Sequence, residues 1–404
     1  MRQKRHTRLK QVTVINVNKS ENKNDLLREG NLVRILLTGG GTAGHINPAL
    51  AMADYIKEKE EDTKVLFVGT EEGMEKTLVP KSGYDIEYIK VHGFERKISV
   101  SNIKNVFEIL SSVRKTKKII KRFKPDIAIG TGGYVTGPVL YAAAKMKIPT
   151  LAHESNAYPG ITIRILAKYV DVTALAFSAA KPYIKNAKEV VVTGNPLRPE
   201  LFKTCKAAAR EKLSLDNRRV ILIFGGSLGA TRFNEAAVSF ISALHDIDKY
   251  QIIMSAGKNN HYEKVMNMFS RSGIDLNEHK NIRVFEYIYD MASALSACDL
   301  IIGRSGSSVA EMTALKKPAI LIPSPNVAGN HQEYNARAME KAGAAKVILE
   351  RDLSARSLYD AVDEIFKNEN VYEEMAKSAE NIGIKDATAR LYEIAKRITA
   401  KQKL

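Results

Sequence analysis

The chain has 404 residues, 45% of them hydrophobic and 26% charged, which is the composition of a globular protein long enough for two domains. It contains no run of about eighteen apolar residues that could span a bilayer, no secretory signal, and only two cysteines, Cys205 and Cys298, in no zinc or disulfide spacing, so a reducing cytoplasm is expected. The formal net charge of +17 favours binding to an anionic membrane surface or to a pyrophosphate substrate, with a basic solvated surface as the alternative. Only 7% of the residues are aromatic and no nucleic-acid-binding motif occurs, so we expect no nucleic acid as a partner.

Residues 1–31 are polar, rich in Asn and Lys, and without periodicity, so we expect a disordered basic tail. From residue 34 onward, short apolar strands alternate with helical patterns, which indicates βαβ units and parallel sheets. The first set of strands is expected at 34–40, 64–70, 125–130, 148–153, 171–177 and 189–193. The second set is expected at 219–225, 250–256, 281–287, 299–303, 318–322 and 345–349. We therefore predict an α/β fold with two doubly wound, Rossmann-like domains.

A segment with two prolines and a glycine, residues 192–199, separates the two sets of strands and is expected to be a hinge. The first domain would then span 32–197 and the second 198–385. Asp386 is a candidate N-cap for a final helix with its apolar residues on one face. We expect this helix, 386–404, to pack back on the first domain.

Each set of strands opens with a glycine-rich turn directly after an apolar strand. The first turn contains Gly39, Gly41 and Gly44, and the second lies at 225–230. Such a turn lets backbone N–H groups and a helix N-terminus approach an anion closely. Two turns of this kind indicate two nucleotide-binding folds facing a shared cleft, which suits a transferase that holds two bulky substrates.

The glycines at 39, 41 and 44 also satisfy the dinucleotide-binding fingerprint, and Glu71 follows the next strand, so an NAD(P)-dependent oxidoreductase is an alternative. Against it, His45 and Pro48 follow the glycines at once, and the second half has an anion site of its own. At a helix N-terminus the dipole disfavours the imidazolium, so His45 should stay neutral and able to accept a proton near pH 7. It is the candidate general base for an alcohol, unless it merely ties the glycine loop together.

Two further segments should lie on the rim of the first crevice, because each follows the carboxyl end of a strand. Residues 131–138 form another glycine loop, and His153-Glu-Ser-Asn156 ends the next strand. Glu154 and Asn156 could bind sugar hydroxyls, or Glu154 could orient a base. For His153 we favour a structural bond to loop backbone.

In the second half, a strand leads into the small-residue turn Ser305–Ser308 and a helix start, which offer hydroxyls and free N–H groups to a diphosphate. Glu311, one turn into the helix, is placed to accept from both hydroxyls of a ribose. An acidic residue in a first helical turn is also common without a ligand. The amide-rich segment 330–336 suits several sugar hydroxyls, which need donors and acceptors.

Residues 92–124 combine an amphipathic helix with a strongly basic end. Its apolar residues fall at helical spacing, which is typical of core packing. These residues are Ile103, Val106, Phe107, Leu110 and Val113. Seven cations then occur in the eleven residues 114–124, and Phe94 and Ile98 precede the helix. The combination predicts an interfacial membrane patch, with a solvated basic face as the alternative.

Six motifs occur along the chain in a fixed order. They are Gly-Gly-Gly-Thr-Ala-Gly-His-Ile-Asn-Pro (39–48), Gly-Gly-Tyr-Val-Thr-Gly-Pro (132–138), His-Glu-Ser-Asn (153–156), Gly-Asn-Pro-Leu-Arg (194–198), Gly-Gly-Ser-Leu-Gly-Ala (225–230) and Asn-His-Gln-Glu-Tyr-Asn-Ala (330–336). Together they resemble the MurG family of bacterial N-acetylglucosaminyltransferases, from about residue 34 to the C-terminus.

This resemblance implies a GT-B fold, two Rossmann-like domains with an interdomain cleft, and no metal or cofactor. It implies an inverting transfer of N-acetylglucosamine from UDP-GlcNAc to the C4 hydroxyl of MurNAc in undecaprenyl-pyrophosphoryl-MurNAc-pentapeptide, which turns lipid I into lipid II in peptidoglycan synthesis. The first domain would bind the lipid acceptor and the second UDP-GlcNAc, at the anionic cytoplasmic face of the cell membrane. A GT-B enzyme that glycosylates a diacylglycerol lipid is the alternative.

From the residue patterns above, the candidate catalytic residues are His45 and Glu154. The resemblance adds roles in substrate binding. The candidate substrate contacts are Thr42, Ala43, Gly44, Asn156, Arg198, Ser227, Ile288, Ser307, Ser308, Glu311 and Gln332. Among these, Glu311 would bind the ribose, and Ile288 would hold uracil through its backbone groups.

Overall fold

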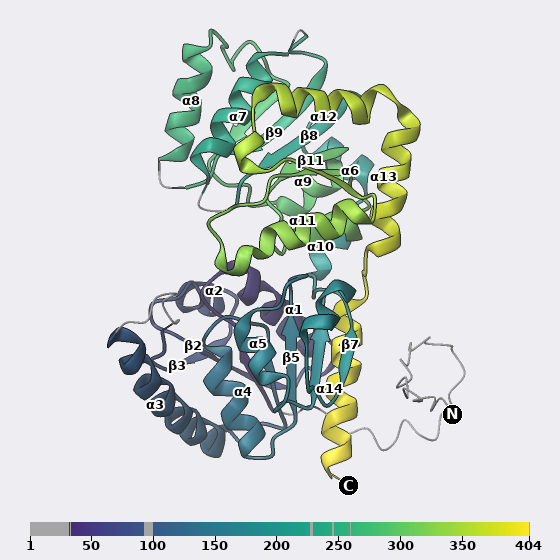
Figure 1. Cartoon of the computed structure of the whole chain (residues 1–404). Helices are drawn as coiled ribbons and strands as arrows, with labels where there is room; N and C mark the ends of the chain where they lie inside the picture. Colours follow the sequence, from purple (N-terminus) through teal and green to yellow (C-terminus); the bar gives the residue numbers. More distant parts are fainter. Residues whose placement is uncertain are drawn as a thin grey trace, which may run out of the picture.

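The structure is a computed structural model that describes residues 32, 34–92, 100–226, 229–244, 246–258 and 260–403. Within these residues the chain forms two α/β domains, one above the other in Figure 1, each built around a parallel sheet. The tail expected at 1–31 lies outside the described residues.

The first sheet has the strand order β3-β2-β1-β4-β5-β6-β7, and every pairing is parallel. Its strands are β1 (Arg34–Thr38), β2 (Lys64–Gly69), β3 (Asp85–Tyr88), β4 (Ile127–Gly130), β5 (Thr150–Glu154), β6 (Val172–Leu175) and β7 (Val190–Val192). The order reverses between β1 and β4, the switch point where open α/β sheets bind their ligands.

Helices cover both faces of this sheet. They are α1 (Ala43–Lys59), α2 (Glu75–Lys81), α3 (Val100–Phe123), α4 (Thr136–Lys145) and α5 (Ile161–Leu166). Because side chains alternate along a strand, Ile35 and Leu37 of β1 pack with α1, whereas Leu36 packs with α4 on the other face. Both faces are therefore apolar, as expected for a parallel sheet.

The second sheet has the order β10-β9-β8-β11-β12-β13, which repeats the order of the first six strands of the first sheet, again with parallel pairings only. Its strands are β8 (Arg219–Phe224), β9 (Tyr250–Ser255), β10 (Ile282–Phe285), β11 (Leu300–Gly303), β12 (Ala319–Leu321) and β13 (Ala345–Val347). Its helices are α6 (Lys206–Lys212), α7 (Thr231–Ser242), α8 (His261–Arg271), α9 (Met291–Ala297), α10 (Val309–Ala314), α11 (His331–Lys341), α12 (Ala355–Lys367) and α13 (Glu369–Ile382). The switch point lies between β8 and β11.

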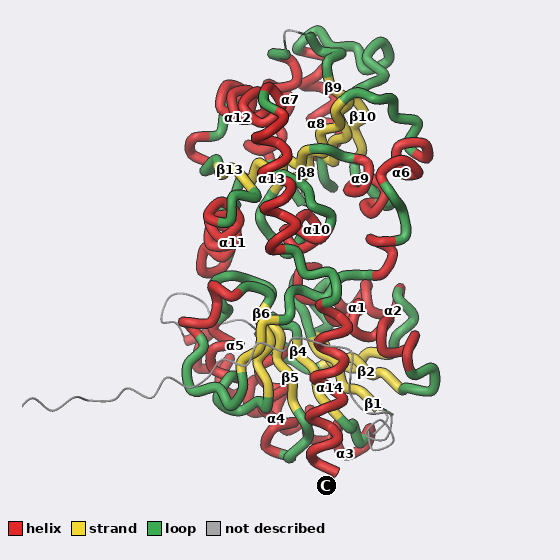
Figure 2. Tube along the Cα trace, turned by 90° about the vertical axis from the view of Figure 1, so that its right-hand side faces the viewer, coloured by secondary structure: helices red, strands yellow, loops and turns green. Residues whose placement is uncertain are grey.

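The last helix, α14 (Ala387–Lys403), leaves the second domain and packs on the first (Figure 2). Its apolar face joins the core formed by β1 and α1, and Tyr392 donates a hydrogen bond of 2.7 Å to Glu60. The crossing segment lies beside the hinge, because a Cβ on Gly194 would come within 2.6 Å of Ile384. Leu197 also exchanges hydrogen bonds of 3.2 Å with Thr388, so the two connections between the domains lie side by side.

The predicted alternation of strands and helices is confirmed, and the fold class with it. One strand, β3, is missing from the sequence prediction. It is a four-residue edge strand, Asp85-Ile-Glu-Tyr88, with no buried residue in it. Its short alternating pattern gives too few apolar residues to stand out from the polar loops around it.

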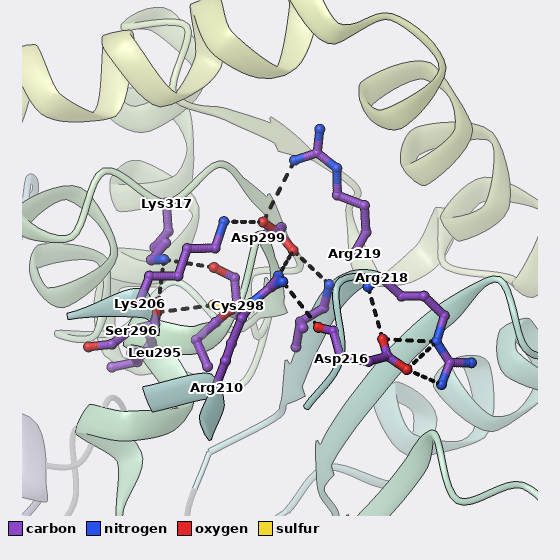
Figure 3. A network of polar contacts seen from close by, with 12 residues as sticks. Lys206, Arg210, Asp216, Arg218, Arg219, Leu295, Ser296, Cys298, Asp299 and Lys317 are labelled. Atoms are coloured by element: carbon purple, nitrogen blue, oxygen red, sulfur yellow. Dashed lines mark hydrogen bonds and ion pairs between the residues drawn. The ribbon is translucent and has the colours of Figure 1, made fainter. Parts of the chain in front are cut away.

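A buried carboxylate, Asp299, organises the amino-terminal ends of the central strands of the second sheet, β8 and β11 (Figure 3). It accepts hydrogen bonds from the backbone N–H of Val220 at 2.7 Å, from Arg210 at 2.7 Å and from Lys206 at 2.5 Å. The Arg219 guanidinium lies 3.7 Å away. Since the carboxylate joins α6, β8 and the start of β11, it fixes the frame on which the second crevice is built.

The replacement Asp299→Asn should therefore destabilise the second domain. Removing one partner of a buried charge network costs about 3 kcal/mol or more, and we expect its thermal transition to fall by several degrees. The exposed pair of Asp216 and Arg218 is the matched control, because Asp216→Asn should cost at most about 1 kcal/mol. Calorimetry on both variants makes the comparison, and equal shifts would contradict the role given to Asp299.

Candidate functional site

The two crevices face each other, and the helices that begin in them meet. Gly44, in the first turn of α1, lies against Ser307, which precedes α10, and a Cβ on Gly44 would be 3.3 Å from the Ser307 hydroxyl oxygen. The start of α1 in the first domain is thus brought against the turn before α10 in the second.

The glycine loop before α1 is shaped by close contacts. A Cβ on Gly39 would lie 2.6 Å from the His45 carbonyl oxygen, and Gly41 has φ +84°. Thr42 is extended, with φ −133°, and ends the loop as the residue before the helix. Within the described residues the N–H groups of Ala43 and Gly44 donate no hydrogen bond, so both are available to an anionic ligand.

The surroundings of His45 favour a neutral imidazole. Its Nδ1 lies 3.1 Å from the Gly40 carbonyl oxygen, and since a carbonyl can only accept, Nδ1 carries the proton and Nε2 the lone pair. Burial lowers the pKa of His45 below its usual value, and His331 across the cleft acts in the same direction. Nε2 has no hydrogen-bond partner within the described residues. The chemistry expected of His45, acceptance of a proton at neutral pH, is available to it.

His153 has a structural place instead. Its Nε2 donates to the Gly194 carbonyl at 3.0 Å, which ties the end of β5 to the hinge. Burial lowers the pKa of His153 to about 4, so the ring is neutral at pH 7. This is the loop-backbone bond that the sequence suggests.

Glu154 holds its own loop. One carboxylate oxygen accepts from the backbone and side-chain nitrogens of Asn156, both at 2.9 Å, and the other accepts from the Gly160 N–H at 2.8 Å. Burial raises the pKa of Glu154, although these hydrogen bonds oppose the shift. Glu154 forms no hydrogen bond with His45 or His153 in the described structure. This geometry favours orientation of Asn156 over direct participation in proton transfer.

Asn335 of α11 joins the two domains, a role the sequence analysis missed. Its side-chain nitrogen donates to Asn156 at 3.1 Å and to the Ser305 carbonyl at 3.0 Å, and its oxygen accepts from the Ala157 N–H at 2.7 Å. The residue is completely buried. Within segment 330–336, for which sugar binding is expected, this amide links residues of the two domains.

An aromatic pair reinforces the same contact. Tyr158 of the first domain stacks on Tyr334 of α11, with ring centroids 4.6 Å apart and an interplanar angle of 19°. Stacked aromatic pairs of this kind are worth about 1 kcal/mol beyond the area they bury. The contact between the domains therefore rests on hydrogen bonds and ring stacking together.

The turn before α10 presents unused donors to the cleft. The backbone N–H groups of Gly306, Ser307 and Ser308 donate no hydrogen bond within the described residues. Beside them, the Gln332 side-chain oxygen accepts from the Ser324 N–H at 2.9 Å, which leaves its NH₂ group near Gly306 as a donor. Unused donors of this kind are suited to an anionic ligand.

Glu311 lies deeper, in the first turn of α10. Burial raises its pKa to about 7, and Arg198 opposes the shift electrostatically. Carboxylates whose pKa is shifted toward neutrality are found often at functional sites, so Glu311 is a candidate for ligand binding.

Ile288 follows β10 and is buried, and neither its N–H nor its carbonyl forms a hydrogen bond within the described residues. Free backbone groups at this point are what a uracil base requires.

Ser227 lies outside the described residues. In the part of the chain that the structure describes, no cluster of three or more His, Cys, Asp or Glu side chains could hold a metal ion.

The comparison with known proteins agrees with this geometry. Residues 35–175 match the glycosyltransferase family 28 N-terminal domain, and residues 220–398 match the family 28 C-terminal domain. A relative from Acetivibrio thermocellus, named UDP-N-acetylglucosamine–N-acetylmuramyl-(pentapeptide) pyrophosphoryl-undecaprenol N-acetylglucosamine transferase, is 46% identical over 368 residues, which cover 91% of this chain and 98% of the relative. The chain belongs to the MurG family of glycosyltransferases. A relative of the same name from Bacillus cytotoxicus is 42% identical over 91% of this chain and 100% of its own length.

Solved structures support the same fold assignment. The crystal structure of Acinetobacter baumannii MurG aligns with a TM-score of 0.72 and 28% identity, covering 90% of this chain and 99% of that one. The UDP-GlcNAc 2-epimerase of Neisseria meningitidis aligns with a TM-score of 0.62 at 16% identity over 89% of this chain and 99% of that one, and so shares the fold. The GT-B fold and the glycosyltransferase class are confirmed. The oxidoreductase and nucleic-acid hypotheses are not supported.

Proposed function

We propose that this MurG-family chain transfers N-acetylglucosamine from UDP-GlcNAc to the C4 hydroxyl of MurNAc in undecaprenyl-pyrophosphoryl-MurNAc-pentapeptide, with inversion and without a metal. The activity follows from the family. The observation that supports the mechanism is the meeting of two N–H-lined turns, one of which carries the neutral His45. The diacylglycerol-lipid alternative is not favoured, because the relatives are named for the MurNAc-pentapeptide acceptor.

The donor would lie on the second domain, residues 198–385. Uracil would bond the backbone of Ile288, and the ribose hydroxyls would donate to Glu311 near Arg198. The diphosphate would sit on the N–H groups of Ser307 and Ser308, with the Ser227 loop as a further contact, and the amide donor of Gln332 would reach a sugar hydroxyl or phosphate oxygen. Preorganised amides then stabilise the departing UDP where other enzymes use a cation.

The acceptor would enter from the first domain, residues 32–197. Its C4 hydroxyl attacks C1 of N-acetylglucosamine from the face opposite the UDP oxygen, and the bond from C1 to that oxygen breaks. The hydroxyl proton passes to Nε2 of His45, whose Nδ1–H stays on Gly40. The substrates would be held in the cleft between the domains by Asn156, which Glu154 orients. The N–H groups of Ala43 and Gly44, beside Thr42, would contribute further hydrogen bonds.

Removal of the His45 base provides the first test. We expect His45→Ala to lower the turnover with labelled UDP-GlcNAc and a lipid I analogue by about 100-fold or more, the usual contribution of general base catalysis, with UDP-GlcNAc affinity nearly unchanged. His279→Ala, at a surface histidine, is the matched control. Wild-type product should form equally well with EDTA, and a diacylglycerol acceptor should give none. Unchanged turnover in His45→Ala would remove it as the base, and loss of product with EDTA would contradict metal independence.

The pKa of Glu311 predicts a pH dependence for donor binding. Below about pH 7 the free carboxyl is protonated and must lose its proton to accept from two ribose hydroxyls. UDP-GlcNAc affinity should therefore rise between pH 6 and pH 8, by up to about tenfold per pH unit below the pKa, and then level off. Calorimetric titration measures this. In Glu311→Gln the affinity should be weaker and flat across the window, whereas the control Glu340→Gln, near the C-terminal end of α11, should keep the wild-type slope.

We also propose that α3 holds the enzyme to an anionic membrane surface as a peripheral protein on the cytoplasmic side. Phe107 and Leu110 are 68% and 49% exposed, so the core packing expected for them does not occur, although Val113 packs on the core. Basic residues continue the helix on the outer flank of the first domain (Figure 1). Phe94 and Ile98 lie outside the described residues. No helix in the described ranges meets the length and hydropathy needed to cross a bilayer.

A vesicle-binding experiment tests this patch. The double variant Phe107→Ser/Leu110→Ser should bind vesicles rich in phosphatidylglycerol at least tenfold more weakly than the wild type, because each apolar side chain contributes about 1.5 kcal/mol or more on burial. Binding should also weaken in high salt. Phe202→Ser, an exposed residue beyond the hinge, is the control. Equal binding by the double variant and the wild type would exclude this surface.

A further inference from the structure

Glu75, the first residue of α2, is a buried carboxylate that the reaction as described does not use. It is 1% exposed. One oxygen accepts from the Thr70 N–H at 2.9 Å and the Thr70 hydroxyl at 2.7 Å, and the other accepts from the Gly41 N–H at 2.9 Å. No ion pair with Glu75 is found among the described residues, so backbone amides and one hydroxyl take the place of a cation.

The protein is built closely around this carboxylate. A Cβ on Gly40 would lie 2.6 Å from one of its oxygens, and a Cβ on Gly69 would lie 2.5 Å from its Cγ. Glycines from the first glycine loop and from the end of β2 thus leave the volume that the side chain fills. A buried charge is costly unless its hydrogen bonds are satisfied. The close fit of the Glu75 side chain, next to the glycine loop that carries His45, points to a role in that loop.

The Gly41 N–H and the Gly40 carbonyl belong to the same peptide group. The carboxylate of Glu75 accepts from the N–H side, and the carbonyl side accepts from Nδ1 of His45 at 3.1 Å. Hydrogen bonds in series polarise one another. Because the negatively charged carboxylate accepts from the Gly41 N–H, the Gly40 carbonyl oxygen becomes a stronger acceptor. One peptide therefore connects Glu75 to the imidazole.

We propose that Glu75 is a positioning residue for His45, acting through the Gly40–Gly41 peptide. The carboxylate fixes the peptide, the peptide fixes the Nδ1–H tautomer and the ring orientation, and Nε2 is left free for the acceptor hydroxyl. When Nε2 takes the hydroxyl proton, the imidazolium charge is stabilised by the polarised carbonyl. No proton moves to Glu75. This inference rests on the proposed role of His45 as the base.

The electrostatic surroundings of His45 agree with this arrangement. Burial lowers its pKa, the bond to Gly40 and the charge of Glu75 raise it, and His331 from α11 lowers it. His153 of β5 also lies within electrostatic range. Glu75 is thus the only carboxylate among the groups found to act on His45 in the described structure, and it opposes the effect of burial.

The decisive measurement follows His45 directly. In the full chain with ¹⁵N-labelled histidine, Glu75→Gln should lower the NMR titration midpoint of His45 by at least half a pH unit relative to wild type. The acidic limb of the kcat/KM profile should move to lower pH by the same amount, and kcat should fall at least tenfold with UDP-GlcNAc affinity unchanged. Glu72→Gln, an exposed residue three positions earlier, is the matched control and should leave all three unchanged.

The outcomes separate this inference from the proposed function. An unmoved His45 midpoint in Glu75→Gln would overturn the inference, even if activity fell. A moved midpoint with unchanged kcat would leave the linkage intact but would overturn the catalytic use of Glu75, whereas His45 as the base is decided separately by His45→Ala. If Glu75→Gln does not fold, Glu75→Asp keeps the charge but withdraws it from Gly41. It should then give a smaller downward shift and intermediate kcat, and a wild-type midpoint would again overturn the inference.

Discussion

Two sets of unpaired backbone N–H groups meet where Gly44 of α1 approaches Ser307 before α10. Each set carries partial positive charge, so bringing the two together without a ligand is electrostatically unfavourable. Asn335 and the stacked pair Tyr158 and Tyr334 oppose that repulsion. A doubly charged diphosphate between the turns would turn the same repulsion into attraction, so donor binding and closure of the cleft reinforce each other.

The rest of the molecule keeps these turns in place. Each follows the carboxyl end of a central strand at the switch point of its sheet, and both sheets share one strand order. Buried carboxylates anchor the frame on each side. Asp299 holds the amino-terminal ends of β8 and β11 in the second sheet, and Glu75 holds the first glycine loop. Rigid parallel sheets thus position loops that have few bonds of their own.

Local sequence patterns were sufficient for the fold and for most of the candidate site. Glycines after an apolar strand predict a crevice, and His45 directly after them predicts a histidine at a helix start, because these features depend on neighbours along the chain. The exposure of Phe107 could not be predicted, since apolar residues at helical spacing are usually buried. Edge strand β3 was too short to be distinguished from a loop.

The residues that were missed act across long separations. Asn335 bonds Asn156, 179 residues away, and Glu75 bonds Gly41, 34 residues away. Nothing local marks Glu75, which begins α2 like many acidic residues in a first helical turn. The series of bonds from its carboxylate to His45 exists only once β1 and β2 pair and bring the two loops together.

The course of the C-terminal helix has a consequence for dissecting this protein. Leu391, Ile394 and Ala395 of α14 complete the apolar core under β1, so a fragment ending at the hinge would leave an uncovered hydrophobic groove. The first domain is therefore discontinuous in sequence. Independent production of that domain calls for a genetic fusion that returns the final seventeen-residue helix to it, and expression of the first half alone should yield aggregates.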